Sequence, residues 1–487
     1  MRSFFLVYLC LSVVWVSGQE STALPADVQR DSIFIHADVS NNQNVFIIDS
    51  IMLQGNKTTR RHIILRELTF KTGDTIPAFL LAKNFKNSRD NLLNTSLFNF
   101  VTVYDSVISS GHFIHLDVKI HFVERWYIWP FPILELSDRN FNTWWKEKDF
   151  GRLSYGLFLK KENVRGRMET LWLLARFGYD EKYQLGYDIP YINRQQTFGA
   201  GIGAGWSQNH EVAYQTVDNK LQHVNTGDEY LFKNYYSYLR LTHRPTLYHH
   251  HLLQLNYNYY VFGDTVLKLN PNYSFGNEEV NEYLNIFYRF TIDHRDSKVY
   301  PLNGSYFMGA LSRSGFGVLK NGDISMMELL GSYQKYWKLK NRFHLASDWS
   351  GKFSTVRDQP YFYQRGLGYD RNFVRGYELY VIDGQSFILS KNTVKFTLLP
   401  TRVTNIDFIN SEKFAKIHYT IYLNWFLDVG YVEAFRNSET NDLSNTLLIG
   451  TGFGIDLVTY YDLVIRVEAS VNGLGEPGVF LHFKNTL

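Results

Sequence analysis

Two stretches of the sequence combine residue types that could do chemistry, but neither predicts a catalytic or metal site. The run 450–454 (GTGFG) is glycine-rich like a nucleotide-binding loop, yet no helix is predicted after it, and its glycines share one face of a predicted strand. The run 249–251 is three histidines, but neighbouring strand residues point to opposite sides, which favours a polar turn. The sequence has no Gly-x-Ser-x-Gly, His-Glu-x-x-His, Cys-x-x-Cys or Walker motif. We therefore expect neither an enzyme nor a cofactor.

Charged residues recur at regular positions in long alternating segments, and this alternation predicts β-strands. Within 418–431, Trp425 lies on the apolar face and Asp428 on the polar face. Segments 283–293 and 343–354 alternate in the same way. Such strands have roughly 10 or more residues, close to the number that crosses a bilayer at a tilt.

The part of the chain before residue 126 has a different pattern, which predicts a small mixed domain. A strand at 46–53 is followed by helical stretches at 59–68 and 78–93, and then by strands at 98–104 and 113–123. The order β-α-α-β-β over residues 45–125 can enclose one core of about 80 residues. We expect this unit to fold on its own.

The N-terminus and the composition predict a secreted protein. Arg2, an apolar run and the small residues Ser17 and Gly18 indicate a signal peptide at 1–18, followed by a polar lead at 19–44. The single cysteine, Cys10, lies in that peptide, so the mature chain is expected to have no disulfide and no thiolate metal site. Aromatic residues make up 17% of the chain, as in barrels with aromatic belts, and a net charge of +3 gives no argument for nucleic acid.

Residues 126–487 have the strand length and number of a membrane barrel. Composition alone fits a secreted β-sandwich or propeller about as well, but no segment approaches the roughly 18 apolar residues of a membrane-spanning helix. At roughly 20–25 residues per strand and connection, this region holds an even number of strands near 16. A closed barrel also leaves no strand edge in hydrocarbon. The predicted fold is mostly β: a transmembrane 16-stranded antiparallel β-barrel, preceded by one small α/β domain.

Several motifs, in the same order, resemble the BamA/TamA-type outer-membrane protein assembly superfamily. Residues 48–123 resemble its POTRA domain, so the resemblance covers nearly all of the mature chain. The barrel motifs are Asp293-His294-Arg295-Asp296 with Pro301 and Gly304, Val374-Arg375-Gly376-Tyr377, Phe426-Leu427-Asp428-Val429-Gly430, and the segment 466–470.

In that superfamily the Val-Arg-Gly-Tyr segment is the tip of a long sixth extracellular loop that folds back into the barrel lumen. The resemblance implies this position for Arg375 and its neighbours. Asp428 and Glu468 fall on the polar faces of late strands, and a guanidinium buried in a barrel needs a carboxylate partner. We expect Asp428 to be that partner. The glutamate that the family usually places after the loop is missing here, because this chain has Thr393-Val394-Lys395-Phe396.

The C-terminal segment has the spacing of the β-signal by which outer-membrane barrels are recognised. Gly478, Leu481 and Phe483 occupy its glycine, apolar and aromatic positions. Pro477 donates no ladder hydrogen bond, so we expect a weak seam between this strand and the first barrel strand, predicted at about 133–137. Any outer-membrane barrel could carry the signal, which therefore predicts location more than function.

By resemblance, the chain is expected to insert or translocate other proteins at a bacterial outer membrane, with its POTRA domain in the periplasm. Strand exchange at the seam and β-augmentation at a POTRA edge, 97–104, would do this work. Expected partners are unfolded outer-membrane or secreted client proteins, periplasmic or lipoprotein subunits, and membrane lipid. The alternatives are a two-partner-secretion pore of the FhaC type, which normally has two POTRA domains, and an accessory barrel that inserts nothing. The mitochondrial sorting-and-assembly barrel also has one POTRA domain, but the signal peptide favours a bacterial membrane.

Overall fold

A computed structural model describes residues 33–40, 44–109, 113–136, 153–227, 229–319, 324–369, 372–405, 412–435, 441–459, 461 and 463–484. The predicted signal peptide and the first part of the polar lead lie outside the described residues. Within the described residues, no helix is long and apolar enough to cross a membrane.

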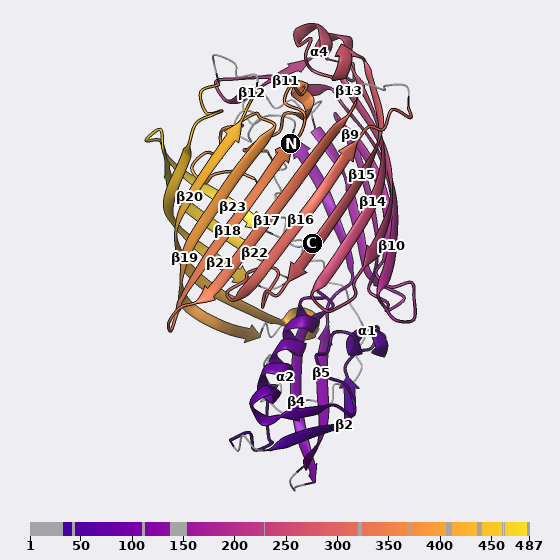
Figure 1. Ribbon diagram of the computed structural model, residues 1–487, viewed down its shortest axis with the longest axis vertical. Coiled ribbons are helices and arrows are strands. Elements are labelled where there is room, and N and C mark those ends of the chain that lie inside the picture. Colours follow the sequence, from indigo (N-terminus) through magenta and orange to yellow (C-terminus); the bar gives the residue numbers. More distant parts are fainter. Residues whose placement is uncertain are drawn as a thin grey trace.

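The N-terminal domain is a five-stranded sheet with two helices, and it lies below one end of the barrel (Figure 1). The sheet order is β1-β4-β5-β2-β3. Side chains of the longer helix that are three to seven residues apart, such as Leu81, Phe85 and Leu92, are fully buried against this sheet. The elements are β1 (Ile33–Phe34), β2 (Val45–Gln54), α1 (Arg61–Leu65), β3 (Thr75–Pro77), α2 (Ala78–Leu93), β4 (Phe98–Ser109) and β5 (Phe113–Glu124).

The first helix is shorter than the predicted 59–68 because the residues after it turn towards the barrel. Arg66 donates from Nε to the carbonyl of Gln196, at 3.0 Å. Glu67 forms an ion pair with Arg244, with Nη1–Oε1 at 2.5 Å and Nη2–Oε2 at 2.8 Å. The end of α1 thus docks on two barrel turns instead of continuing as a helix.

The polar lead contributes to this domain, which the sequence pattern does not predict. Strand β1 pairs in parallel with Val103 and Tyr104 of β4. The carboxylate of Asp105 accepts hydrogen bonds from the backbone N–H groups of His36 (2.6 Å) and Ala37 (3.1 Å). The ordered domain therefore begins before residue 45, and the predicted free edge at 97–104 is wrong where β1 covers it. A two-residue strand is too short to show an alternating pattern.

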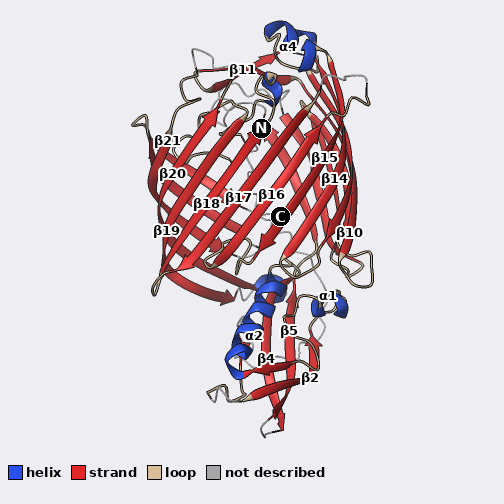
Figure 2. Cartoon of the chain, in the orientation of Figure 1, coloured by secondary structure: helices blue, strands red, loops and turns tan. Residues whose placement is uncertain are grey.

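The barrel is a 16-stranded sheet in which every described neighbouring pair is antiparallel, as predicted (Figure 2). A separate hairpin, β11 (Glu211–Val217) and β12 (Lys220–Asn225), stands in the loop between two of its strands. The barrel strands are β6 (Ile128–Leu136), β7 (Leu153–Val164), β8 (Glu169–Gly178), β9 (Glu181–Ile189), β10 (Phe198–Asn209), β13 (Phe232–His243), β14 (His249–Phe262), β15 (Val280–Asp293), β16 (Gly304–Ser314), β17 (Met326–Lys338), β18 (Phe343–Ser354), β19 (Ser386–Asn405), β20 (Lys416–Glu433), β21 (Leu448–Thr459), β22 (Leu463–Asn472) and β23 (Pro477–Lys484).

The predicted alternation sorts side chains between an apolar outside and a polar inside. On β20 the side chain of Trp425 is exposed, whereas Asp428 is fully buried. On β21 the glycines of the 450–454 run face inwards, and Phe453 faces outwards. The exposed outer face carries large apolar residues around the barrel, among them Leu157, Leu173, Leu185, Ile202, Leu239, Leu255, Ile286, Leu311, Leu329, Phe353, Ile388, Leu423, Ile455, Val467 and Leu481.

Two predicted boundaries in the barrel are wrong. The histidine run 249–251 opens strand β14 and is not a turn. The first barrel strand begins at Ile128, before the predicted 133–137, and contains Pro130 and Pro132. Proline is tolerated in a strand whose nitrogen side faces an edge, so these residues do not end the strand here.

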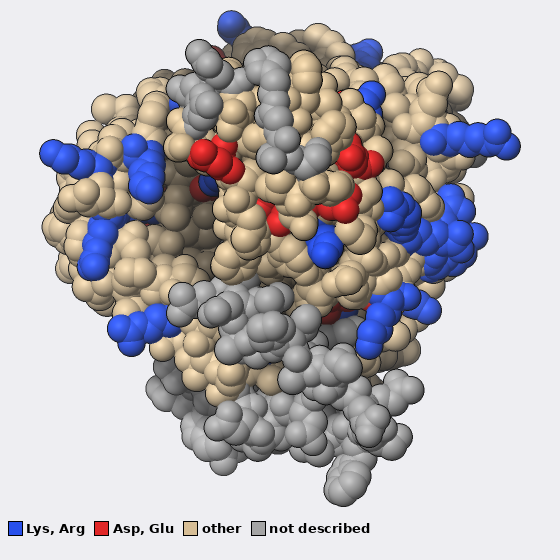
Figure 3. All heavy atoms as spheres, turned by 90° about the horizontal axis from the view of Figure 1, so that it is seen from below, with Lys and Arg blue, Asp and Glu red and all other residues tan. Residues whose placement is uncertain are grey.

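Strands β6 and β23 are the two ends of the sheet, and the barrel seam lies between them. At the POTRA end, the Trp129 ring of β6 packs 4.8 Å from Tyr461, in the turn between β21 and β22. Seen from this end, Lys and Arg side chains stand mainly at the periphery of the molecule (Figure 3).

Candidate functional site: a lumenal loop beside an open seam

The loop between β18 and β19, residues 355–385 and here called loop six, lies against the inner wall of the late strands. Its Val374 and Tyr377 are buried in a cluster with Leu389 of β19 and Val432 of β20. The loop can approach the barrel wall closely because β21 has a glycine at the contact. A Cβ on Gly450 would lie 1.8 Å from the Arg375 carbonyl oxygen. Gly376 has a φ of +97°, which other residues rarely adopt.

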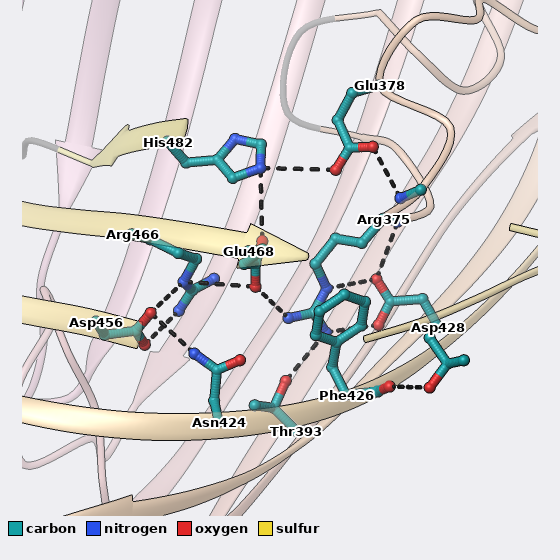
Figure 4. Close-up of polar contacts among 12 residues, drawn as sticks. Arg375, Glu378, Thr393, Asn424, Phe426, Asp428, Asp456, Arg466, Glu468 and His482 are labelled. Carbon is teal, nitrogen blue, oxygen red and sulfur yellow. Dashed lines mark hydrogen bonds and ion pairs between the residues drawn. The ribbon is translucent and has the colours of Figure 1, made fainter. Parts of the chain in front are cut away.

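Arg375 is held by two carboxylates, a hydroxyl and an aromatic ring (Figure 4). Its Nε and Nη2 donate to the two oxygens of Asp428, at 2.7 and 2.6 Å. Its Nη1 donates to Glu468 Oε1 at 3.1 Å, and the guanidinium carbon lies 3.8 Å from the Phe426 ring centre. Arg375 is only 4% exposed, and Asp428 and Glu468 are at most 1% exposed. A buried guanidinium in this geometry is neutralised and has well-directed acceptors.

Thr393, in the run 393–396 where the resemblance implies a glutamate, is a neutral partner of Arg375. Its Oγ1 accepts a hydrogen bond from Arg375 Nη2 at 3.0 Å. Asp428 and Glu468 already supply two negative charges to this guanidinium, so a hydroxyl is sufficient at the third position.

The charged groups continue along the inner wall towards the POTRA end. Arg466 donates to both oxygens of Asp456, at 2.7 and 2.9 Å, and also lies 3.7 Å from Glu468. Tyr300, in the turn between β15 and β16, donates its hydroxyl to Asp456 at 2.6 Å. Burial, reinforced by the Asp456 carboxylate, raises the pKa of Tyr300 well above its usual value, so the phenol keeps the proton that it donates. Arg375 and Tyr300 are therefore joined through one polar network.

The predicted Asp293–Asp296 motif lies at the junction with the POTRA domain and does not contact Arg375. Arg295 pairs with Asp293 at 2.8 Å, and Asp296 Oδ1 accepts the backbone N–H of Leu302 at 3.1 Å. Gly304 has a φ of +111°, and a Cβ there would lie 2.2 Å from the His294 carbonyl oxygen. This glycine therefore fits a position that no larger residue could occupy.

Asn94, at the end of α2, joins the POTRA domain to this same turn. Its side-chain nitrogen donates to the Asp296 carbonyl at 3.2 Å, and its side-chain oxygen accepts the Lys298 backbone N–H at 2.9 Å. A second contact is the ion pair of Glu67 and Arg244. Burial disfavours the charge on Arg244, but Glu67 and Tyr191 outweigh this and raise its pKa.

Loop six also holds the terminal hairpin of β22 and β23 from the inside. Asn472 donates from Nδ2 to the Gly376 carbonyl at 3.1 Å, and Gly473 N donates to the Tyr377 hydroxyl at 3.1 Å. The Tyr380 hydroxyl contacts both oxygens of Glu476 at 2.9 Å. The turn that leads into β23 is thus fastened to loop six, and β23 itself, which carries Gly478, Leu481 and Phe483, pairs with β22.

The seam itself has no hydrogen-bonded ladder among the described residues. Each barrel strand from β7 to β22 pairs with two neighbours, but β6 pairs only with β7, and β23 only with β22. The structure therefore brings Arg375, Asp428 and Glu468 together beside an unpaired strand edge.

Some of these residues were not identified from the sequence. The alternation of its strand places Asp456 on the inward face, so the sequence could have identified it. No local pattern predicts that Tyr300, 156 positions away, bonds to Asp456. Pro130 and Pro132 are two residues apart, a spacing that could have indicated an edge strand. Within the described ranges, no group of three or more His, Cys, Asp and Glu side chains is placed to hold a metal ion.

No family model and no curated protein matches the sequence. Among solved structures, CdiB from Escherichia coli aligns with a TM-score of 0.52 at 13% identity, covering 90% of this chain and 75% of CdiB. The chain has the CdiB fold. BamA from Haemophilus ducreyi lacking POTRA domains 1–3 aligns at 0.48 and 11% identity, over 90% of this chain and 83% of that chain. A BamA-type barrel with a POTRA domain is the fold that the sequence resemblance predicts.

Proposed function

We propose that the protein spans a bacterial outer membrane, with its POTRA domain in the periplasm. The apolar outer face of the barrel matches a hydrocarbon environment, and aromatic side chains such as Trp337, Phe343 and Tyr431 are exposed on it. The Lys and Arg side chains at the periphery of the POTRA end can contact lipid headgroups (Figure 3).

The protein's proposed work is to insert client proteins into this membrane, or to move them across it, by strand exchange at the seam. The observation that carries this proposal is the absence of a described ladder between β6 and β23 in a sheet whose other neighbours are fully paired. Each unpaired backbone group in hydrocarbon costs several kcal/mol, so an unpaired edge favours the addition of a strand. No energy source beyond this exchange is needed.

The edges of the POTRA sheet favour a role in binding client proteins or subunits over a role in adding a client strand to the sheet. Strand β1 covers the middle of the β4 edge, at Val103 and Tyr104, so a client strand would have to displace it there. The other edge, β3, has three residues and ends in Pro77. Unfolded client proteins and periplasmic or lipoprotein subunits are the proposed partners of this domain.

A cross-link across the seam tests the proposal. Leu134 of β6 and Val479 of β23 both face outwards, and residues 19–487 contain no native cysteine. Cells that depend on Leu134→Cys/Val479→Cys protein are treated with a short bismaleimide, and newly folded outer-membrane proteins are measured by their heat-dependent mobility. We expect locking to stop assembly, whereas each single-cysteine variant supports it.

The range of affected proteins then decides between insertion and export. Loss of many outer-membrane proteins after locking supports insertion, and loss of one secreted protein supports an export pore. Normal assembly and secretion with a fully cross-linked barrel would show that the seam is not the functional site.

A further inference from the structure

The seam-facing edge of β6 lacks two backbone hydrogen-bond donors. Pro130 and Pro132 stand at alternate positions, so their nitrogens point to the same side of the strand. The backbone bond from Glu162 N to Tyr127 O, at 2.7 Å, shows that odd-numbered residues of this segment bond to β7. The even-numbered residues, including both prolines, therefore face the seam.

A side chain occupies one backbone carbonyl group on this same edge. The indole Nε1–H of Trp126 donates to the carbonyl of Ile128, which is the first even-numbered residue of β6. Trp126 is fixed in turn, because its backbone N–H donates to the Tyr461 hydroxyl at 3.3 Å. Prolines and covered backbone groups are the means by which natural sheets discourage the addition of a strand at an edge.

The seam-facing edge of β23 lacks one donor at its first residue, Pro477, and keeps the donors that follow. The backbone bond from Asn472 N to Glu476 O, at 3.2 Å, shows that even-numbered residues of this segment bond to β22. Val479, Leu481 and Phe483 therefore present their N–H and C=O groups to the seam. In the part of the chain that the structure describes, no partner is found for these three N–H groups.

We infer that an incoming transmembrane β-strand of a client protein pairs with β23 and that β6 does not template it. The occupant is an extended segment with apolar residues at alternate positions, because its outward side chains must lie beside Leu481 and Val479, which are 56% and 74% exposed. A hollow lined by Leu379, Tyr380 and Glu476 lies beside the start of β23. This inference rests on the proposed strand exchange and assigns it a direction.

A matched pair of cysteines compares the two edges. Leu481 of β23 and Leu134 of β6 both face outwards from seam-facing positions and are 56% and 50% exposed. Full-length Leu481→Cys and Leu134→Cys proteins in lipid vesicles are mixed with a synthetic peptide of residues 416–433 that carries an activated disulfide at its midpoint. We expect roughly tenfold more adduct at position 481, because a strand at β6 forgoes two backbone hydrogen bonds and a strand at β23 forgoes one, at Pro477. A shuffled peptide without alternation should couple at neither site.

Restoring the missing donors gives a second readout in the same protein. Pro130→Val/Pro132→Val in the Leu134→Cys background should raise adduct formation at position 134 to near the level at 481, with the barrel shown to be folded by its heat-dependent mobility. Equal adduct at both edges of the native-proline proteins would overturn the inference and leave the proposed strand exchange standing. No adduct at either edge would overturn both. A disulfide-linked protein dimer in place of the peptide adduct would identify a second copy as the occupant and also overturn the inference.

Discussion

The two strands on either side of the seam are held in place by different parts of the molecule. Strand β23 is fastened from inside the barrel, where loop six bonds to its hairpin and Arg375 bonds to Glu468 of β22. Strand β6 is fastened from outside the barrel, through its connection to the POTRA domain. There Arg125 N and the Tyr127 hydroxyl both donate to the Leu97 carbonyl, at 2.9 Å.

Separate anchors allow the seam to part while both strands keep their places. A barrel whose end strands depended on each other would lose its structure when they separated, because the exposed backbone groups would have no other support. Here the contacts of loop six with the terminal hairpin and the contacts of the POTRA domain with β6 are made by different residues. Three substitutions and one truncation test whether these anchors are independent.

The largest effect is expected from Arg375→Ala, which breaks the anchor of β23. It leaves Asp428 buried without its paired guanidinium and Glu468 with the more distant Arg466, at 3.7 Å, and removing one partner of a buried ion pair costs about 3–5 kcal/mol. Denaturant titration in lipid vesicles measures the loss, and hydrogen exchange should show faster exchange in β23 and unchanged exchange in β6. Arg357→Ala is the matched control, because Arg357 is exposed in the same loop. A loss no larger than that of the control would show that loop six does not anchor β23.

Glu67→Gln should loosen the opposite anchor. Arg244 makes two bonds to the Glu67 carboxylate, and a neutral glutamine is a weaker partner for this buried guanidinium. The free energy of docking between the POTRA domain and the barrel should therefore fall by about 3 kcal/mol. Limited proteolysis near residue 125 should then become faster, with the exchange of β23 unchanged. Lys71→Ala, at an exposed position of the same domain, should leave proteolysis unchanged. Faster exchange in β23 would contradict the independence of the two anchors.

The POTRA domain supports β6 only if it is itself complete, and its N-terminal boundary can be tested on isolated fragments. The fragment 33–125 should be more stable than 45–125 by about 2 kcal/mol. The shorter fragment loses the backbone donors of His36 and Ala37 to the carboxylate of Asp105, whose side chain is 0% exposed. Urea unfolding of both fragments measures the difference. Equal stabilities would place the lead outside the domain.

The smallest effect is expected from Tyr300→Phe, which removes the hydrogen bond between the POTRA-end turn and the inner-wall network. Loss of the bond to Asp456 should cost about 1.5 kcal/mol, because Asp456 keeps both bonds from Arg466. Denaturant titration again measures the loss. Tyr306→Phe, on the neighbouring strand β16, is the control for the loss of a tyrosine hydroxyl. A cost as large as that of Arg375→Ala would show that the network is one anchor for both sides of the barrel.

Much of the barrel could be predicted from local patterns. The two-residue alternation is set by strand geometry, so it assigned Asp428 and Glu468 to the interior before any contact was known. Helix α2 was predicted with its observed bounds, because its apolar spacing is sustained over four turns. The first barrel strand was misplaced because its prolines oppose strand formation everywhere except at an edge.

The sequence by itself determined which residues of each strand face the lumen, because side-chain direction follows from the backbone of one segment. Only the tertiary structure decided which of those residues meet. Arg375 reaches Glu468 across 93 positions, Tyr300 reaches Asp456 across 156, and two residues of the lead cover a strand about 70 positions away. It also decided that Pro130 and Pro132 face the seam, since a strand has two edges and the position of β7 chooses between them. Such contacts depend on the closure of the whole sheet, which no local period encodes.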